Sequence, residues 1–516
     1  MLTLDWIMIS RKIKYFKMLL QIRSSIFVLI LLPVFSKASA TTVAKFDFNE
    51  NCKTAYQQII SLKIKSAETT IAAEKKANPT NPVIAYLEHA HDFMIFFVEE
   101  FDDDYKTLNK NFSNRYAIIE AADDKSAWRK YLLAQMDIEM CIANGKMGNY
   151  VTSVLESRRA NILLTENDKK HPTFTPNKKG LGLIHCLIGT IPEKYKWGAS
   201  LFGFSGNLNE GMAELMEVKT YVDKTKFYCE AELNFIYVYG LLYMTNDKVN
   251  AYKLAQQFLK ENPDNLLYHF LAANVAQATA HNDEAISILL KKPSTPDYLH
   301  FDYMDYMLGV SYLRKLDPAA SIWLEKFAKY NTRRNFVKEG YQKLAWSYLI
   351  IGDNINYKKA KLNCKLLGNT VVDADKQALR ELEAQENPNV LLLKARLLCD
   401  GGYYEKGINL MAGHKMADFK IKREQAEFVY RVGRIYHEWG YADKAIPYYL
   451  EAYHQGKEIP QHFSCNSALN LGLIYEQKGN KLLAEKYYTL CINSKNSDFK
   501  NGLEQKARAG LQRIKK

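Results

Sequence analysis

Two stretches near the C-terminus carry the same pattern of residues and decide the fold. The first is FVYRVGRIYHEWGYADKAIPYYLEA (428–452), and the second is SALNLGLIYEQKGNKLLAEKYYTLC (467–491). At one constant offset along the chain, Gly433, Tyr436, Gly440, Ala445, Tyr449 and Ala452 correspond to Gly472, Tyr475, Gly479, Ala484, Tyr488 and Cys491. Each stretch has helical periodicity that a glycine interrupts once. The chain therefore contains a repeated unit of two helices.

The repeated residue types have a packing role. A small residue is needed where two helices cross closely, and a ring one turn later fills the space beside the crossing. Gly440 and Gly479 follow the first helix of each unit, at a position where a positive φ favours glycine. This pattern resembles the tetratricopeptide repeat, and the resemblance implies a stack of helical hairpins.

The same pattern of small and aromatic residues recurs earlier in the chain, with fewer matching positions in each unit. The matching positions are Gly240 and Tyr243, Ala273 and Ala285, Gly309 and Tyr312, Ala345, Tyr348 and Gly352, and Ala395, Gly402 and Gly407. They predict about seven repeats between residues 221 and 495. A longer gap holds a further helical segment near Ala374 to Ala384, and the basic stretch LEQKARAGLQRIKK predicts a C-terminal capping helix. We therefore predict an all-α chain with a helical N-terminal domain (41–220) followed by a right-handed solenoid (221–516).

The predicted N-terminal domain is helical by periodicity but fits the repeat poorly. Its segment IPEKYKWGASLFGFSGNLNEGMAEL (191–215) resembles part of a eukaryotic tetratricopeptide family. That family includes a yeast mitochondrial outer-membrane protein linked to inclusion-body clearance. The resemblance implies an irregular helical region joined to the array, and it implies no ligand.

The segment from Met1 to Ala40 has the features of a secretory signal peptide. The apolar run IFVLILLPVF (26–35) follows Arg23 and precedes SKASA, and the whole segment carries +5 of the net charge of +13. Because a spanning helix needs about 20 apolar residues, the run predicts cleavage after Ala40 rather than stable membrane insertion. Abundant Lys, Asn, Ile and Tyr are typical of a Bacteroidetes-like bacterium with an outer membrane, which favours a periplasmic location.

Composition excludes several classes of protein. The chain has 516 residues, of which 47% are hydrophobic and 25% charged, so it is neither disordered nor a polytopic membrane protein. The charge that remains after the signal peptide is spread along the chain, which argues against nucleic-acid binding. The eight cysteines form no CxxC motif and lie in helical patterns. We expect buried thiols and no metal site, while a single disulfide bridge stays open.

Three short motifs favour structural over catalytic interpretations. In HAHD (89–92), His89 and His91 are two residues apart and point to different sides of a helix, so a chelate is not expected. HEWG at His437 lacks the second histidine of a zinc-protease helix. GFSG (203–206) has the wrong glycine spacing for a nucleophile elbow and predicts a tight turn. We expect no cofactor and no enzymatic activity.

The resemblance to tetratricopeptide proteins implies a concave groove lined by the first helix of each repeat. Its candidate partner-binding residues are Tyr237, Phe270, Tyr306, Trp346, Arg396, Tyr430, Arg434 and His437. Aromatic and arginine side chains are frequent interface anchors, although the same rings could instead pack between helices. Phe270 with Asn274 comes closest to the family's clamp for acidic C-terminal tails but lacks its lysine.

Together these features predict an exported, non-catalytic scaffold that binds a peptide or protein partner. Two alternatives stay open. One is an enzyme or enzyme subunit with a pocket between the N-terminal domain and the array. The other is a structural component of an envelope assembly that uses the convex face.

Overall fold

The computed structural model describes residues 43–189, 206–330, 332–384, 386–495 and 499–515, and within these ranges it contains helices and no strand. The all-α fold class is thereby confirmed. The predicted signal peptide lies outside the described residues. None of the helices in the described ranges combines the length and the apolar character needed to cross a membrane.

The N-terminal region consists of consecutive, packed helices, although its sequence fits the repeat poorly. Its helices are α2 (Glu50–Ile60), α3 (Ile64–Ala77), α4 (Val83–Glu99), α5 (Asp102–Glu120), α6 (Ala127–Met147), α7 (Tyr150–Lys170), α8 (Asn177–Gly189) and α10 (Leu208–Thr225). Helices α2 and α3, α4 and α5, and α6 and α7 pair as hairpins, and α8 packs on α10. Local signals define their ends: the Ser126 hydroxyl accepts from the Trp128 amide at the start of α6, and Gly148 ends it with φ 82°.

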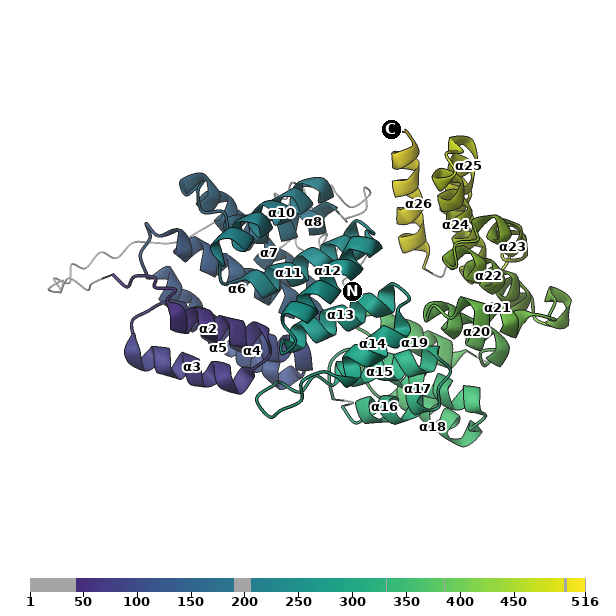
Figure 1. Ribbon diagram of the computed structural model, residues 1–516, viewed down its shortest axis with the longest axis horizontal. Coiled ribbons are helices and arrows are strands. Elements are labelled where there is room, and N and C mark those ends of the chain that lie inside the picture. The colour runs from purple at the N-terminus through teal and green to yellow at the C-terminus, as the bar shows by residue number, and fades with distance from the viewer. Residues whose placement is uncertain (1–42, 190–205, 331, 385, 496–498, 516) are drawn as a thin grey trace, which may run out of the picture.

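Helical hairpins follow one another from residue 230 to residue 492. They are α11 (Glu230–Tyr239) with α12 (Lys248–Glu261), α13 (Leu266–Ala278) with α14 (Asn282–Leu290), α15 (Tyr303–Arg314) with α16 (Ala319–Ala328), α17 (Val337–Ile351) with α18 (Asn354–Leu366), α20 (Val390–Asp400) with α21 (Tyr404–Met411), α22 (Lys422–Glu438) with α23 (Ala442–Gln455), and α24 (Phe463–Gln477) with α25 (Lys481–Ile492). The additional helix α19 (Asp373–Glu383) lies in the longer gap, and α26 (Lys500–Lys515) packs on the last hairpin. Figure 1 shows the chain curving from the N-terminal helices through α13–α19 to α20–α26.

The repeated residues occupy the positions that their chemistry predicts. Gly440 and Gly479 end the first helices of two hairpins with φ values of 90° and 73°. A Cβ atom on Gly309 would lie 2.6 Å from Cγ of Leu324, so α15 and α16 cross closely there. Gly240 differs, because it begins a π-helical turn (Gly240–Met244) and packs against Met212 of α10 rather than against its own hairpin partner.

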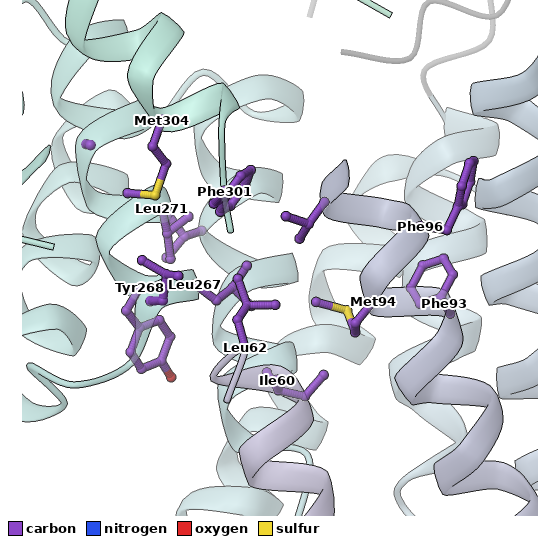
Figure 2. Close-up of a cluster of buried hydrophobic side chains, with 14 of the residues drawn as sticks. Ile60, Leu62, Phe93, Met94, Phe96, Leu267, Tyr268, Leu271, Phe301 and Met304 are labelled. Atoms are coloured by element: carbon purple, nitrogen blue, oxygen red, sulfur yellow. The ribbon is translucent and has the colours of Figure 1, made fainter. Parts of the chain in front are cut away.

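The hydrophobic core does not divide at residue 220, the boundary predicted from the sequence. One cluster of buried side chains extends from Cys52 to Leu397, and a second extends from Leu392 to Tyr487. In Figure 2, Leu62 and Met94 of the N-terminal region gather with Leu267 and Leu271 of α13. The N-terminal helices and the first repeats therefore share one core.

A buried polar network fixes the middle of the array to the N-terminal helices. Glu100, which is 2% exposed, forms ion pairs with Lys146 and Arg333 and accepts a hydrogen bond from Nδ2 of Asn335 at 2.7 Å. Arg333 also pairs with Asp302. Burial raises the pKa of Glu100, but Lys146 and Arg333 outweigh this effect and hold the pKa below its ordinary value. The segment between α16 and α17 is therefore locked onto the ends of α4 and α6.

Candidate partner-binding groove

The predicted groove residues lie on the first helices of their hairpins but differ in exposure. Tyr237, Tyr306, Trp346 and Tyr430 are buried, with 7, 6, 2 and 3% of their surface exposed. Phe270, Arg396, Arg434 and His437 are half-buried. A buried ring cannot touch a partner unless helices separate, so the first four residues have the packing role that the sequence left open. The second four form the accessible part of the predicted set.

Helices α20 and α22 bring Arg396 and Arg434 together at one carboxylate, Asp400. Nη1 of Arg434 lies 2.7 Å from Oδ1 of Asp400, and Nε of Arg396 lies 3.8 Å from Oδ2. The side chains of Arg434, Arg396 and Asp400 are 26, 36 and 24% exposed. Arg314 at the end of α15 and Arg431 on α22 also act on this carboxylate electrostatically. We call Arg314, Arg396, Arg431 and Arg434 the arginine cluster.

The positive charge of the arginine cluster lowers the pKa of two neighbouring groups, Asp400 and His462. Burial raises the pKa of Asp400, but the four arginines outweigh burial and hold the pKa well below its ordinary value. Burial, followed by the charges of Arg431, Arg396 and Arg434, lowers the pKa of His462 to about 3. The surroundings of α20 and α22 therefore disfavour a further positive charge and favour an anion.

Trp346 on α17 links the cluster to the preceding hairpin. Cζ of Arg396 lies 4.8 Å from the Trp346 ring centroid, and Nζ of Lys343 lies 4.1 Å from it. Nε1 of Trp346 donates a hydrogen bond to Oε1 of Glu381 on α19 at 2.6 Å. The guanidinium of Arg396 thus contacts both an aromatic face and the carboxylate of Asp400, which restricts its orientation.

Aromatic side chains of α22 and α24 pack against each other next to the arginine cluster. The hydroxyl of Tyr430 accepts a hydrogen bond from Nδ2 of Asn466 at 2.7 Å, and its ring centroid lies 5.4 Å from that of Phe463. Nδ1 of His437 lies 3.3 Å from the hydroxyl of Tyr449 on α23. Burial lowers the pKa of His437, so the imidazole is neutral at pH 7. His437 therefore packs within its own hairpin.

Phe270 and Asn274 on α13 are held by contacts internal to the array. The Phe270 ring centroid lies 4.9 Å from that of Phe301. Oδ1 of Asn274 accepts hydrogen bonds from the hydroxyls of Tyr239 at 3.2 Å and Tyr243 at 2.8 Å. These contacts already use the amide oxygen, and they give no support to a clamp for acidic tails at this pair.

The sequence analysis did not select several charged residues that surround the predicted groove residues: Arg314, Lys343, Glu381, Asp400 and Arg431. Helical spacing could have identified some of these residues, because residues four apart lie on the same face of a helix. Asp400 follows Arg396 by four residues, and Arg431 pairs with Glu427 at the same spacing, with Nη2 and Oε1 2.7 Å apart. The approach of α15 to α20 has no such local signal, because it depends on how the intervening hairpins stack.

The HAHD motif forms no chelate. His89 is fully buried, and its Nε2 lies 3.3 Å from Oε2 of Glu139. Nδ1 of His91 lies 3.1 Å from Oδ1 of Asp92, which also pairs with Arg115. The two imidazoles contact different helices, in agreement with the predicted divergence of their directions.

The described part of the chain contains one histidine–carboxylate group of metal-binding type that the sequence analysis did not select. The ligand-type atoms of His185 on α8 and of Glu210 and Glu214 on α10 all lie within 4.8 Å of one another. Nδ1 of His185 is 2.6 Å from Oε2 of Glu214, and this contact raises the pKa of His185. Gly206, the last residue of GFSG, has φ 134° and packs on the His185 ring, while 203–205 lie outside the described residues. An ion pair accounts for this group without a metal.

Comparisons with known proteins give structural matches only. No family model and no curated protein matches the chain. A chain of the human IFIT1 dimer with m7Gppp-AAAA matches over 91% of this chain and 90% of its own, at 10% identity and a TM-score of 0.35. The apo form of RapI matches over 90 and 98%, at 12% identity and a TM-score of 0.28. The APC/C hetero-tetramer Cut9–Hcn1 matches over 90 and 95%, at 12% identity and a TM-score of 0.23. The assignment of the fold therefore rests on the hairpins of the chain itself.

Proposed function

We propose that the chain is an exported, non-catalytic scaffold that binds a peptide or protein partner at the arginine cluster. The observation that carries this proposal is the meeting of Arg396, Arg434 and Asp400, three partly exposed charged side chains contributed by two successive hairpins. Arginine is a frequent anchor of protein interfaces, and its guanidinium pairs readily with carboxylates. We infer that the partner presents a segment with carboxylate groups.

The structure gives less support to an enzyme with a pocket between the N-terminal helices and the array. Arg333 and Asn335, which are 2 and 1% exposed, fill that junction together with Glu100. The guanidinium of Arg333 and Nδ2 of Asn335 take part in the network that joins the two regions. These side chains therefore serve the packing of the chain.

Site-specific photo-crosslinking in the expressing cell tests the binding surface. A photoreactive amino acid replaces Arg396 in one variant and, as a control, Leu482, which is 78% exposed on α25, in another. We expect a partner peptide to be crosslinked from position 396 and not from position 482. The same set of captured peptides at both positions would contradict binding at the arginine cluster.

A labelled oligoglutamate peptide tests the inferred chemistry of the partner. Arg434→Ala should weaken its binding by about tenfold, because a charge-assisted hydrogen bond is lost. Asp400→Asn should strengthen binding, since the arginines lose the carboxylate that they share. Arg508→Ala, at a side chain that is 56% exposed on α26, is the control and should leave binding unchanged. Identical affinities in all variants would show that the cluster does not bind carboxylates.

The export part of the proposal rests on the sequence from Met1 to Ala40. The intact mass of protein recovered from the envelope fraction should correspond to a chain that begins at Thr41. Met18 is an alternative start of translation within this segment. A chain in the membrane fraction that begins at Met1 or Met18 would contradict export with cleavage after Ala40.

A further inference from the structure

Helix α18 exposes apolar side chains at the centre of its outer face. Ile355, Leu362 and Leu366 are 81, 54 and 71% exposed. At 100° per residue, the three positions fall within about 40° of one another. The opposite face holds the buried residues Tyr357, Ala360 and Cys364. An ordinary surface helix places charged residues at the centre of its exposed face, so this arrangement is unusual.

Lysines flank the apolar stripe on both sides. Lys359 lies on one side and Lys358 and Lys365 on the other, and all three are exposed. Between Asn354 and Leu366 the sequence contains four lysines and no acidic residue. Among the described residues, no carboxylate forms an ion pair with the ammonium group of Lys358, Lys359 or Lys365. The face therefore combines exposed apolar area with positive charge that lacks an internal counterion.

The neighbouring second helix, α16, adds one exposed apolar side chain to this surface. Ile322 on α16 is 66% exposed. A groove of about 400 Å³ runs between α16 and α18. Lys329 and Lys359 line it together with Glu325, whose carboxylate accepts a hydrogen bond from the Tyr348 hydroxyl. Figure 1 shows α16 and α18 at the lower edge of the molecule, and none of the four arginines of the cluster lies on either helix. The surface is thus separate from the arginine cluster.

We propose that α18 docks the protein onto the surface of a membrane that contains anionic lipid. An apolar stripe flanked by lysines is the arrangement of a helix that lies in the plane of a membrane interface. The stripe would enter the boundary between headgroups and acyl chains, and the lysines would contact lipid phosphates. A peripheral contact of this kind needs no spanning helix, and it does not depend on the proposed groove.

Vesicle flotation with the full chain tests the proposal. The probes are vesicles of phosphatidylcholine alone and of phosphatidylcholine mixed with phosphatidylglycerol. We expect at least about tenfold stronger binding to the anionic vesicles, and we expect this preference to fall as salt is added. Lys358→Gln with Lys359→Gln should abolish the preference, whereas Lys253→Gln with Lys260→Gln on α12 should not.

A matched pair of apolar variants separates membrane docking from general hydrophobicity. Leu362→Ser with Leu366→Ser should lose vesicle binding and keep the circular dichroism spectrum. Val249→Ser with Leu482→Ser, at side chains that are 77 and 78% exposed on other helices, should bind as the wild type does. Equal binding to both vesicle types, or equal loss in both pairs, would overturn the proposal. Concentration-dependent dimerisation that only the α18 pair removes, without vesicle binding, would assign the face to a second copy of the chain.

Discussion

Gly472 and Tyr488 are in such close contact that a Cβ atom on the glycine would lie 2.5 Å from Cδ1 of the ring. Gly510 of α26 faces the same ring, and a Cβ atom there would lie 2.3 Å from Cζ. The Tyr488 ring is fully buried between these two glycines, and its hydroxyl bonds to Glu476. The last hairpin and the capping helix are therefore joined through one aromatic side chain.

Gly472→Leu should destabilise the C-terminal end of the array. Leucine has no space at the crossing, and overpacking of this kind costs about 1–3 kcal/mol. The control is Gly502→Leu, at a glycine of α26 whose Cβ would meet nothing within 4 Å. Better helix propensity should leave the control unchanged or stabilise it by up to about 1 kcal/mol. Amide hydrogen exchange within residues 463–515 should be faster in Gly472→Leu than in the wild type, and it should be unchanged in Gly502→Leu. Equal protection in the two variants would contradict a tight crossing.

Arg333→Met should weaken the whole region from α2 to α19. Without Arg333, the buried carboxylates of Glu100 and Asp302 lose a positively charged partner. Removing one partner of a buried ion pair lowers the free energy of unfolding by about 3–5 kcal/mol. The control is Arg508→Met, which breaks an exposed pair on α26 and should cost about 0.3–0.5 kcal/mol. Urea unfolding measures both variants. A shift no larger than that of the control would show that the network contributes little to stability.

His89 should make stability depend on pH in mildly acidic solution. Burial, followed by the charge of Arg115, lowers its pKa to about 3. As pH falls below the ordinary value of about 6.5, the unfolded chain binds a proton that the folded chain refuses, so stability is lost between about pH 6.5 and 3. From pH 6.5 to 4.5 the wild type should lose about 2 kcal/mol more unfolding free energy than His89→Gln. Parallel profiles would mean that folded His89 is protonated.

The cysteines should be dispensable for folding. All eight are free thiols in the structure, and seven of them are buried. Sγ of Cys465 and Sγ of Cys491 lie 3.3 Å apart, which makes this pair the place where a bridge would form. Thermal melts with and without reductant should agree, and thiol titration after denaturation should give eight groups. A count of six would reveal a disulfide between Cys465 and Cys491.

The sequence predicts what depends on neighbours along the chain and fails where distant segments meet. The spacing of Gly472 and Tyr488 locates a crossing because both residues belong to one hairpin. Helix α19 was also expected near its observed position, from periodicity alone. Asp400 was missed as the centre of the arginine cluster, since its partners lie on three helices. The burial of Trp346 could not be predicted from the sequence either, because α19 and Arg396 cover its ring only after the hairpins have stacked.

The pairing of Glu100 with Asn335 has a consequence for the order of events during synthesis. The two residues are 235 positions apart. At a ribosomal rate of about 5–20 residues per second, Asn335 is made about 12–47 s after Glu100. Arg333, the other distant partner of Glu100, emerges at nearly the same time. Throughout that interval the Glu100–Lys146 pair lacks the two partners that complete its burial, so the nascent N-terminal helices reach their final packing only after more than half of the chain has been translated.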